Sequence, residues 1–190
     1  MTTLVETKYA PKTARDSRVA VSNEVKEVRY ATAQSPLGCL LVARSDRGVC
    51  AVLLGNDARE LGDDLRSRIP SAKLEDDDDA CAYMAATVVA HVKDSSVPLD
   101  FTLDTRGTAF QMRVWKALRA IPPGMTVSYT ELARQVGAPK AVRAVASACG
   151  ANPIALAVPC HRVVSKNGSL GGYRWGVRRK RALLEREKRS

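Results

Sequence analysis

The 190-residue sequence predicts an α+β fold with α/β character, in which a small sheet-plus-helix domain precedes a mostly helical domain. Short strand patterns lie in the first half, and helical patterns with capping signals fill the second. Residues 1–104 carry 13 Lys and Arg against 17 Asp and Glu, whereas residues 105–190 carry 17 against 3. We therefore divide the chain into a flexible leader (1–24), an N-terminal α/β domain (25–104) and a C-terminal domain (105–190).

The N-terminal domain begins with a half-buried strand, since Val28, Tyr30 and Thr32 alternate with polar residues. The elements predicted after it are strands at 39–43 and 49–54 and helices at 58–68 and 80–92. Between the helices, the acidic run 75–79 is expected to be a solvated loop whose charges favour the next helix N-terminus. Residues 101–105 form either a last strand or the linker between the domains.

The C-terminal domain begins with a capped helix. Thr108 and Gln111 have the spacing of a capping box, in which the hydroxyl and the amide satisfy each other's backbone N–H groups. The helix they open is expected to run to Arg119, because the prolines and glycine of 121–124 stop it.

A helix-turn-helix of winged-helix-like type follows. Ser128 and Glu131 form a second capping box, which opens a short helix that ends before Gly137. Pro139 is expected near the first turn of the next helix, and residues 141–150 are strongly helical. A short helix, a short turn and a second helix are the plan of this DNA-binding motif.

The second helix of this motif has two interpretations. It offers one long polar side chain, Arg143, among alanines, so its small face permits close approach to a DNA groove with little base discrimination, as in minor-groove proteins. An arginine there could fill the gap left by an extruded base. Alternatively, residues 141–150 form a packed alanine-rich core helix with Arg143 in an ion pair. The sequence favours neither interpretation.

Cys160 and His161 form the strongest candidate for a reactive site. The thiolate is the nucleophilic form of cysteine, and a nearby imidazole in basic surroundings favours it. Because neighbouring side chains on a strand point to opposite faces, contact between the two requires a turn at Pro159 or a bridging water. The remaining thiols are expected to be buried small hydrophobic residues, namely Cys39, Cys50, Cys81 and Cys149. His91, on a periodic helix, is expected to be structural.

The last helix, which begins near Gly176, supplies a candidate partner for His161. The residues spaced to share one stripe of this helix are Lys180, Leu183, Leu184 and Glu187. A carboxylate on a stripe that faces inward needs a partner, which would give the arrangement Cys160–His161–Glu187. Alternatively, Glu187 lies at a frayed helix end and pairs with a basic residue in solvent, and the stripe alone slightly favours this second interpretation.

Composition narrows the classes of protein. Five scattered cysteines, an odd number without a CxxC pair, indicate a reducing compartment and no disulfide framework. Two histidines are too few for an obvious metal site. No apolar run is long enough to span a membrane and residues 1–23 lack a signal core, so a cytoplasmic protein is predicted, nucleoid-associated if bacterial. The basic second half predicts a polyanionic partner, DNA or RNA.

Residues 105–187 resemble the catalytic domain of the O6-alkylguanine-DNA alkyltransferases, closest to the Ada type. The matching segments are RGTAFQ (106–111), VSY (127–129), PKAVRAV (139–145), NP (152–153), PCHRVV (159–164) and GYRWG (172–176). The first half, including SPLG (35–38), resembles the more variable N-terminal domain of the family and implies a ribonuclease H-like fold.

The resemblance implies roles for the site residues. Cys160 accepts the alkyl group, His161 deprotonates it through water, and Glu187 orients His161. Tyr129 gives a proton or hydrogen bond to the departing guanine and crowds a DNA phosphate. Arg143 replaces the flipped nucleotide in the stack. The DNA-binding residues implied are Tyr129, Lys140, Ala141, Arg143 and Ala144.

The resemblance also implies a pocket for the flipped base. Its residues are Asn152, Pro159, Val163, Tyr173, Arg174 and Trp175. The Val163 carbonyl reads the exocyclic amine of guanine, and Asn152 ties the recognition helix to the active-site loop. Arg174 stands where some relatives have a small residue, which predicts a narrower pocket and an altered tolerance of bulky alkyl groups.

The implied activity is direct reversal of DNA damage. An alkyl group, such as methyl, passes irreversibly and once per protein molecule from O6 of guanine to Cys160, without cofactor or metal; activity on O4 of thymine is left open. The implied partner is double-stranded DNA containing O6-alkylguanine, bound through the minor groove with base flipping by a monomer whose cooperativity is also left open. The zinc-binding cysteines of the Ada regulatory domain have no counterpart, so transcriptional activation is not implied.

Three other functions compete with this one. Non-catalytic lesion-binding relatives lack the cysteine, so Cys160 argues against that class. A helix-turn-helix regulator would bind one DNA sequence whether or not it is damaged. A Cys-His hydrolase would turn over esters or amides through an acyl intermediate.

Overall fold

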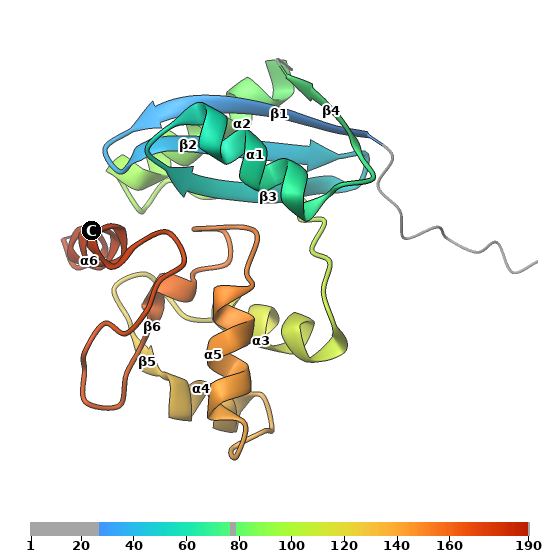
Figure 1. Cartoon of the computed structure of the whole chain (residues 1–190). Coiled ribbons are helices and arrows are strands. Elements are labelled where there is room, and N and C mark those ends of the chain that lie inside the picture. Colours follow the sequence, from blue (N-terminus) through green and yellow to red (C-terminus); the bar gives the residue numbers. More distant parts are fainter. Residues whose placement is uncertain (1–26, 77–78, 190) are drawn as a thin grey trace, which may run out of the picture.

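The computed structural model describes residues 27–76 and 79–189 and shows a sheet domain beside a helical domain (Figure 1). The α+β prediction is confirmed. The leader predicted at 1–24 lies outside the described residues. None of the helices within the described ranges has the length and apolar character that a bilayer-spanning segment requires.

The N-terminal domain is a four-stranded sheet with strand order β3-β2-β1-β4. Its elements are β1 (Glu27–Ser35), β2 (Gly38–Ser45), β3 (Gly48–Gly55), α1 (Ala58–Arg68), β4 (Lys73–Asp76) and α2 (Asp79–Lys93). In Figure 1, α1 lies in front of the sheet and α2 behind it. Because both faces are covered, the middle of β2 and β3 is buried at consecutive residues rather than alternate ones.

The acidic run 75–79 is not simply a solvated loop, which corrects the prediction. Glu75 and Asp76 belong to β4, which pairs in parallel with β1 at the sheet edge. Basic neighbours stabilise the acidic strand, since Glu75 receives an ion pair from Lys73 at 2.6 Å and from Arg29 at 3.5 Å. Asp79 opens α2, as its charge predicted.

The segment 101–105 is a linker with one bridge to the sheet, since Leu103 pairs in parallel with Val49. The next residue, Asp104, is buried and accepts hydrogen bonds from Ser45 at 2.7 Å and from Arg106 at 2.6 Å. The chain therefore enters the second domain from a fixed point on the first.

The C-terminal domain has the predicted helices. Its elements are α3 (Ala109–Arg119), β5 (Val127–Ser128), α4 (Tyr129–Gln135), α5 (Val142–Gly150), the 3-10 turn η1 (Cys160–Arg162), β6 (Val163–Val164) and α6 (Val177–Glu187). The capping box at Thr108 is complete, with both reciprocal hydrogen bonds present. Gly137 ends the short helix with φ +72°, the left-handed conformation typical of C′.

Pro139 differs from its predicted place. It lies in a turn ahead of α5, whose N-cap is Ala141, so it is outside the first helical turn. The residue before a proline is biased away from helical angles, and Ala138, which precedes Pro139, lies outside both helices. Ala141 is the N-cap residue of α5 and makes no side-chain hydrogen bond there. The second predicted capping box is only half formed, because the Ser128 hydroxyl accepts from the N–H of Glu131 but the Glu131 carboxylate pairs with Arg134 instead of returning to Ser128.

Backbone and side-chain bonds join the two domains. Val52 in β3 donates to the carbonyl of Pro153 at 3.0 Å and accepts from the N–H of Ala155 at 2.9 Å, which adds one bridge to the sheet edge. From α6, Arg179 donates to the carbonyls of Leu37 at 2.7 Å and Gly55 at 2.6 Å. The active-site loop and the last helix are therefore both held against the sheet domain.

The complete capping box predicts a measurable contribution to stability. Replacing Thr108 by Ala removes the acceptor for the N–H of Gln111 and should lower the free energy of unfolding by about 1 kcal/mol in urea titrations. Thr87→Ala is the control, because Thr87 lies inside α2 and donates to the carbonyl of Tyr83. Ala has the higher helix propensity, so that change should be neutral or slightly stabilising. Equal losses in both variants would contradict the capping role.

Candidate active site

Cys160 begins the 3-10 turn η1 and is 4% exposed. The backbone therefore turns at this point, as one of the two predicted alternatives required, and Cys160 and His161 do not lie on a regular strand. The turn is closed by the N–H of Arg162, which donates to the carbonyl of Pro159 at 3.0 Å.

Asn152 fixes the loop that leads to Cys160. Its side chain is fully buried, and its amide nitrogen donates to the Val158 carbonyl at 2.7 Å and to the Cys160 sulfur at 3.3 Å. Its amide oxygen accepts from the N–H of Ile154 at 2.9 Å. Between Ile154 and Val158, the two backbone partners of Asn152, the buried residue Leu156 adopts φ +68°. A leucine holds this left-handed conformation only where its surroundings enforce it.

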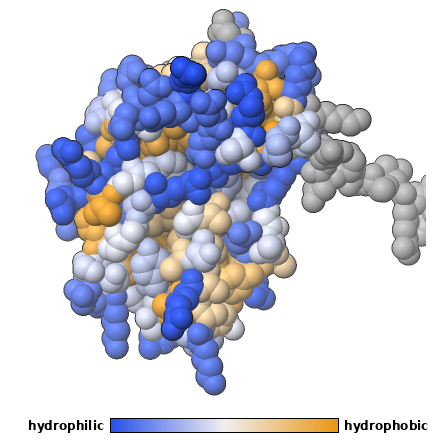
Figure 2. Space-filling view, in the orientation of Figure 1, coloured by the Kyte–Doolittle hydropathy of each residue, from blue (hydrophilic) through white to orange (hydrophobic). Residues whose placement is uncertain are grey.

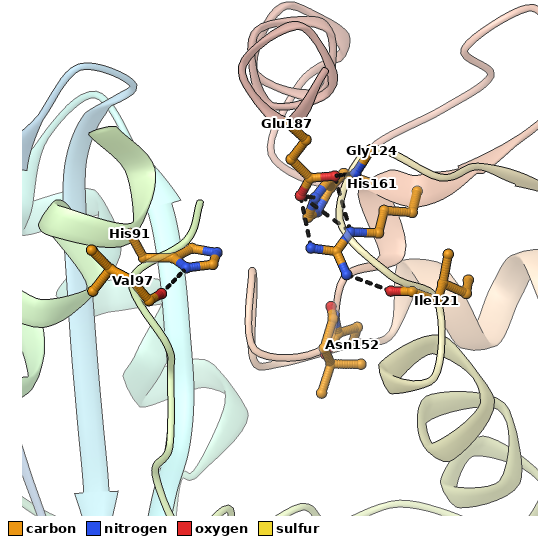
Figure 3. A network of polar contacts seen from close by, with 9 residues as sticks. His91, Val97, Ile121, Gly124, Asn152, His161 and Glu187 are labelled. Carbon is orange, nitrogen blue, oxygen red and sulfur yellow. Dashed lines mark hydrogen bonds and ion pairs between the residues drawn. The ribbon is translucent and has the colours of Figure 1, made fainter. Parts of the chain in front are cut away.

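His161 and Glu187 form a buried, hydrogen-bonded pair (Figure 3). His161 directly follows Cys160 in the turn η1. The imidazole Nε2 lies 2.7 Å from the Glu187 carboxylate, so Nε2 carries the proton and donates it. Nδ1 then has a free lone pair, and among the described residues it has no hydrogen-bond partner. The pair agrees with the alternative in which Glu187 faces inward and contacts His161. It excludes the alternative in which Glu187 lies at a frayed helix end in solvent.

Two further donors complete the shell of Glu187. The guanidinium of buried Arg162 donates to the carboxylate from Nε at 3.0 Å and from Nη2 at 2.8 Å, and to the Ile121 carbonyl from Nη1 at 2.5 Å. The N–H of Gly124 donates at 3.2 Å to Oε2, the carboxylate oxygen that Nε of Arg162 also contacts. A buried charge with this many donors is compensated rather than stranded.

The surroundings shift the pKa values of these groups. Burial raises the pKa of Glu187, but hydrogen bonds from His161 and Arg162 outweigh it and bring that pKa to about 2. Burial lowers the pKa of His161 below its usual value, which keeps the imidazole neutral. Burial raises the pKa of Cys160 to about 11, although the hydrogen bond from Asn152 and the charge of Lys180 oppose it. The free site therefore pairs a protonated thiol with a neutral base.

A cavity of about 380 Å³ opens at Cys160. Its lining residues are Tyr129, Ala146, Cys149, Gly150, Cys160, Ser165, Gly171, Gly172, Tyr173 and Arg174. The volume lies within the range of small-molecule pockets. Burial raises the pKa of Tyr129 to about 12, so its hydroxyl stays protonated at the cavity wall.

Lys180 supports the loop that forms one wall of the cavity. Its ammonium group is buried and donates to the carbonyls of Val163 at 2.5 Å, Gly172 at 3.4 Å and also Leu170. The whole stripe of α6 that was predicted to face inward is buried. The Val163 carbonyl, expected to read the guanine amine, is thus engaged by Lys180 in this structure.

The predicted pocket residues separate into two groups. Tyr173 and Arg174 line the cavity, whereas Asn152, Pro159, Val163 and Trp175 do not. Tyr129, which was predicted as a catalytic and DNA-binding residue, also lines it. Trp175 packs edge-on against Tyr173 with ring centroids 5.2 Å apart and lines a different hollow, together with Leu37 of the sheet domain.

The helix α5 presents its small-residue face outward. Arg143 and Ala144 are exposed, Ala141 is half-buried, and Lys140 is exposed just ahead of the helix. In the space-filling view, the half of the molecule that holds α5 shows weakly hydrophobic surface broken by hydrophilic side chains (Figure 2). Val145, Ala148 and Cys149 face the core, so the helix is packed on one side and open on the other.

His91 and the other cysteines lie where the sequence predicted. His91 belongs to the other domain and donates from Nδ1 to the Val97 carbonyl at 2.6 Å, apart from the His161 network (Figure 3). The four remaining cysteines are buried and form no disulfide within the described residues. One of them, Cys149, also lines the cavity, which the sequence did not indicate.

The supporting roles of Arg162 and Lys180 were not predicted from the sequence. For Lys180 a signal existed, because it shares the buried stripe of α6 with two leucines. For Arg162 there was none, since its partners Glu187 and Ile121 are far away in the sequence.

Comparison with known proteins agrees with this geometry. The DNA-binding domain of 6-O-methylguanine DNA methyltransferase matches residues 109–189, and the ribonuclease-like domain of the same protein matches residues 28–102. The crystal structure of Mycobacterium tuberculosis OGT in complex with DNA is similar, with a TM-score of 0.72 and 40% identity over 85% of this chain and 93% of that one.

Curated relatives extend the similarity. The bifunctional transcriptional activator/DNA repair enzyme Ada of Escherichia coli is 53% identical over 84% of this chain and 45% of its own length, so the present chain spans about half of it. The methylated-DNA–protein-cysteine methyltransferase of Mycobacterium tuberculosis is 44% identical over 85% of this chain and 93% of its own length. These similarities confirm the resemblance seen in the sequence, and the chain belongs to the methylated-DNA–protein-cysteine methyltransferase family.

Proposed function

We propose that this protein reverses alkylation damage by moving an alkyl group from O6 of guanine in double-stranded DNA to its own Cys160. The observation that carries the proposal is that Cys160 lines a cavity and is followed in the same turn by the neutral base His161, which is hydrogen-bonded to the buried Glu187 carboxylate. Transfer is irreversible and occurs once per molecule, because the thioether product has no ready leaving group. The reaction needs no cofactor.

The residues supply each proton that the transfer requires. His161 takes the Cys160 proton through a water at Nδ1, and the thiolate attacks the alkyl carbon opposite O6. The C–O bond breaks as the C–S bond forms, and the electron pair passes to the guanine. Tyr129 protonates the departing purine, and its phenolate regains through solvent the proton held by His161. Glu187 stabilises the imidazolium that forms in this cycle.

The DNA is held through α5 and the basic charge of its domain. Residues 105–190 carry 17 Lys and Arg against 3 Asp and Glu, which favours a polyanion. Ala141 and Ala144 allow close approach to the minor groove beside Lys140, and exposed Arg143 fills the stack when the damaged base flips into the cavity. Asn152, Pro159, Val163 and Trp175 shape the base pocket from behind its lining.

The protein acts as a monomer in the cytoplasm, in association with the nucleoid if the organism is bacterial. The five cysteines, all within the described residues, form no disulfide, which supports a reducing environment. One reactive thiol per chain is enough for a stoichiometric repair, so no second subunit is needed for the chemistry.

Intact mass measurement tests the reaction directly. After mixing with a duplex that carries one O6-methylguanine, the protein should gain one methyl group, which peptide mapping should assign to Cys160, with one equivalent transferred per protein. Cys160→Ser should lose all transfer yet retain DNA binding, since the thiol is 4% exposed and does not contact the phosphates. Turnover of many substrates per molecule, or methylation of Cys149 in place of Cys160, would refute the proposal.

The pKa directions predict the pH profile of a single turnover. Burial holds the pKa of His161 below its usual value near 6.5, so the imidazole is already neutral, and able to act as a base, at neutral pH. The rate constant should be flat from about pH 7 to 9 and fall only below about pH 6.5 as His161 becomes protonated. A tenfold rise per pH unit from 7 to 9 would instead indicate direct ionisation of Cys160, whose pKa is about 11. His91→Gln should leave the profile unchanged.

The role of Arg143 predicts a dependence on DNA structure. Arg143→Ala should slow repair in duplex DNA by about tenfold, because part of the unstacking free energy is no longer recovered. Reaction with the free O6-alkylguanine base, which needs no flipping, should be unaffected. Arg66→Ala, which removes an exposed arginine from the other domain, is the matched control. Equal losses with both substrates would make Arg143 a structural residue.

A further inference from the structure

Arg174 is a cavity residue whose guanidinium is held from the other domain. It lines the cavity of Cys160. Its Nη1 donates to the carbonyl of Gly150 at 3.3 Å, and its Nη2 donates to the carboxylate of Asp64 at 3.3 Å. Asp64 belongs to α1 of the sheet domain, 110 residues earlier in the chain. A wall of the candidate pocket is thus anchored by a residue outside the catalytic domain.

The Asp64 carboxylate is itself fixed. Its Oδ2 accepts from Nη2 of Arg68 at 3.0 Å, one helical turn further along α1. Arg68 is only 16% exposed, so it cannot swing freely into solvent. With Oδ2 held inside its own domain, Oδ1 is presented to Arg174, and each oxygen serves one arginine.

The second anchor gives the guanidinium a defined orientation. Gly150 is the last residue of α5, and carbonyls at a helix C-terminus carry unsatisfied negative partial charge. Gly150, Gly172 and Tyr173 line the cavity beside Arg174, so the guanidinium spans from the end of α5 to the sheet domain. Its side chain is 37% exposed, which places it at the mouth of the cavity and not on its floor.

We infer that Asp64 is a specificity-determining positioning residue for alkyl transfer. By holding Arg174 at the cavity mouth, it limits the bulk of the alkyl group that can reach Cys160. The inference rests on the proposed function. Without the Asp64 charge, the Arg174 guanidinium keeps only the Gly150 carbonyl as an acceptor, becomes more mobile and no longer narrows the cavity mouth. Large alkyl groups then enter more easily, whereas transfer of methyl groups, which already fit, is not accelerated.

Because the Asp64–Arg174 ion pair is partly exposed, its effect on alkyl-group specificity can be measured separately from an effect on stability. Asp64 and Arg174 are each about one-third exposed, and the second pair of Asp64, with Arg68, is a helical i,i+4 pair. Ion pairs of both kinds add little to the free energy of folding. Loss of the Asp64 charge should therefore leave the thermal unfolding midpoint unchanged while altering which groups are transferred. A purely structural role would show the opposite result.

The experiment compares single-turnover rate constants of full-length Asp64→Asn on duplexes that carry either O6-methylguanine or O6-benzylguanine. The benzyl rate constant should rise about two- to fivefold, the range that one exposed ion pair can supply, with the methyl rate constant unchanged. Asp63→Asn is the matched control, because Asp63 precedes Asp64 in α1, is 67% exposed and forms an ion pair with Arg66 of its own helix. That variant should behave as the wild type.

A double-mutant cycle tests whether Asp64 acts through Arg174. In an Arg174→Gln background, Asp64→Asn should produce no further change in the benzyl-to-methyl ratio. An unchanged ratio in Asp64→Asn alone, an equal change in both rate constants, or full additivity with Arg174→Gln would each overturn the inference. Wild-type protein that transfers neither group would refute the proposed function itself, and failure at that level is distinct from an unchanged ratio.

Discussion

The buried carboxylate of Glu187 is the constraint on which the active site depends. A charge removed from water is tolerated only where donors surround it, and here they come from separate segments: His161 and Arg162 in the turn η1, and Gly124 in the loop after α3. Each segment must occupy its place for the carboxylate to be satisfied. The same contacts that permit the charge also orient the imidazole, so folding of the last helix and assembly of the site are one event.

The sheet domain contributes position without contributing reactive groups. It binds the active-site loop through the backbone of Val52, and its Gly55 carbonyl accepts a hydrogen bond from Arg179 of the last helix. Asn152 directly precedes the loop segment that is bonded to Val52, and its buried side-chain amide donates to the Cys160 sulfur. Preorganisation of this kind is what a displacement at sulfur requires, because the attacking atom must already lie in line with the bond that breaks.

Local signals in the sequence predicted much of the fold. The capping box at Thr108 and the inward stripe of α6 both depend on residues within a few positions of one another, and both are present. Features that depend on distant partners were not predictable. The strand character of Glu75 and Asp76 arises from pairing with β1, and the burial of Arg162 arises from a carboxylate 25 residues away. The resemblance of the sequence motifs identified the reactive residues, but the residues that line the cavity could be identified only from the structure.

The backbone bridge between β3 and the active-site loop has a consequence for how the molecule opens. The amides of Val52 and Ala155 are bonded to each other's segments across the domain boundary, so neither can exchange its hydrogen with solvent unless the domains part. Parting them would also release Arg179 from the carbonyls of Leu37 and Gly55. The two domains should therefore exchange and unfold as a single cooperative unit, and a protease should find no stable half-molecule to leave behind.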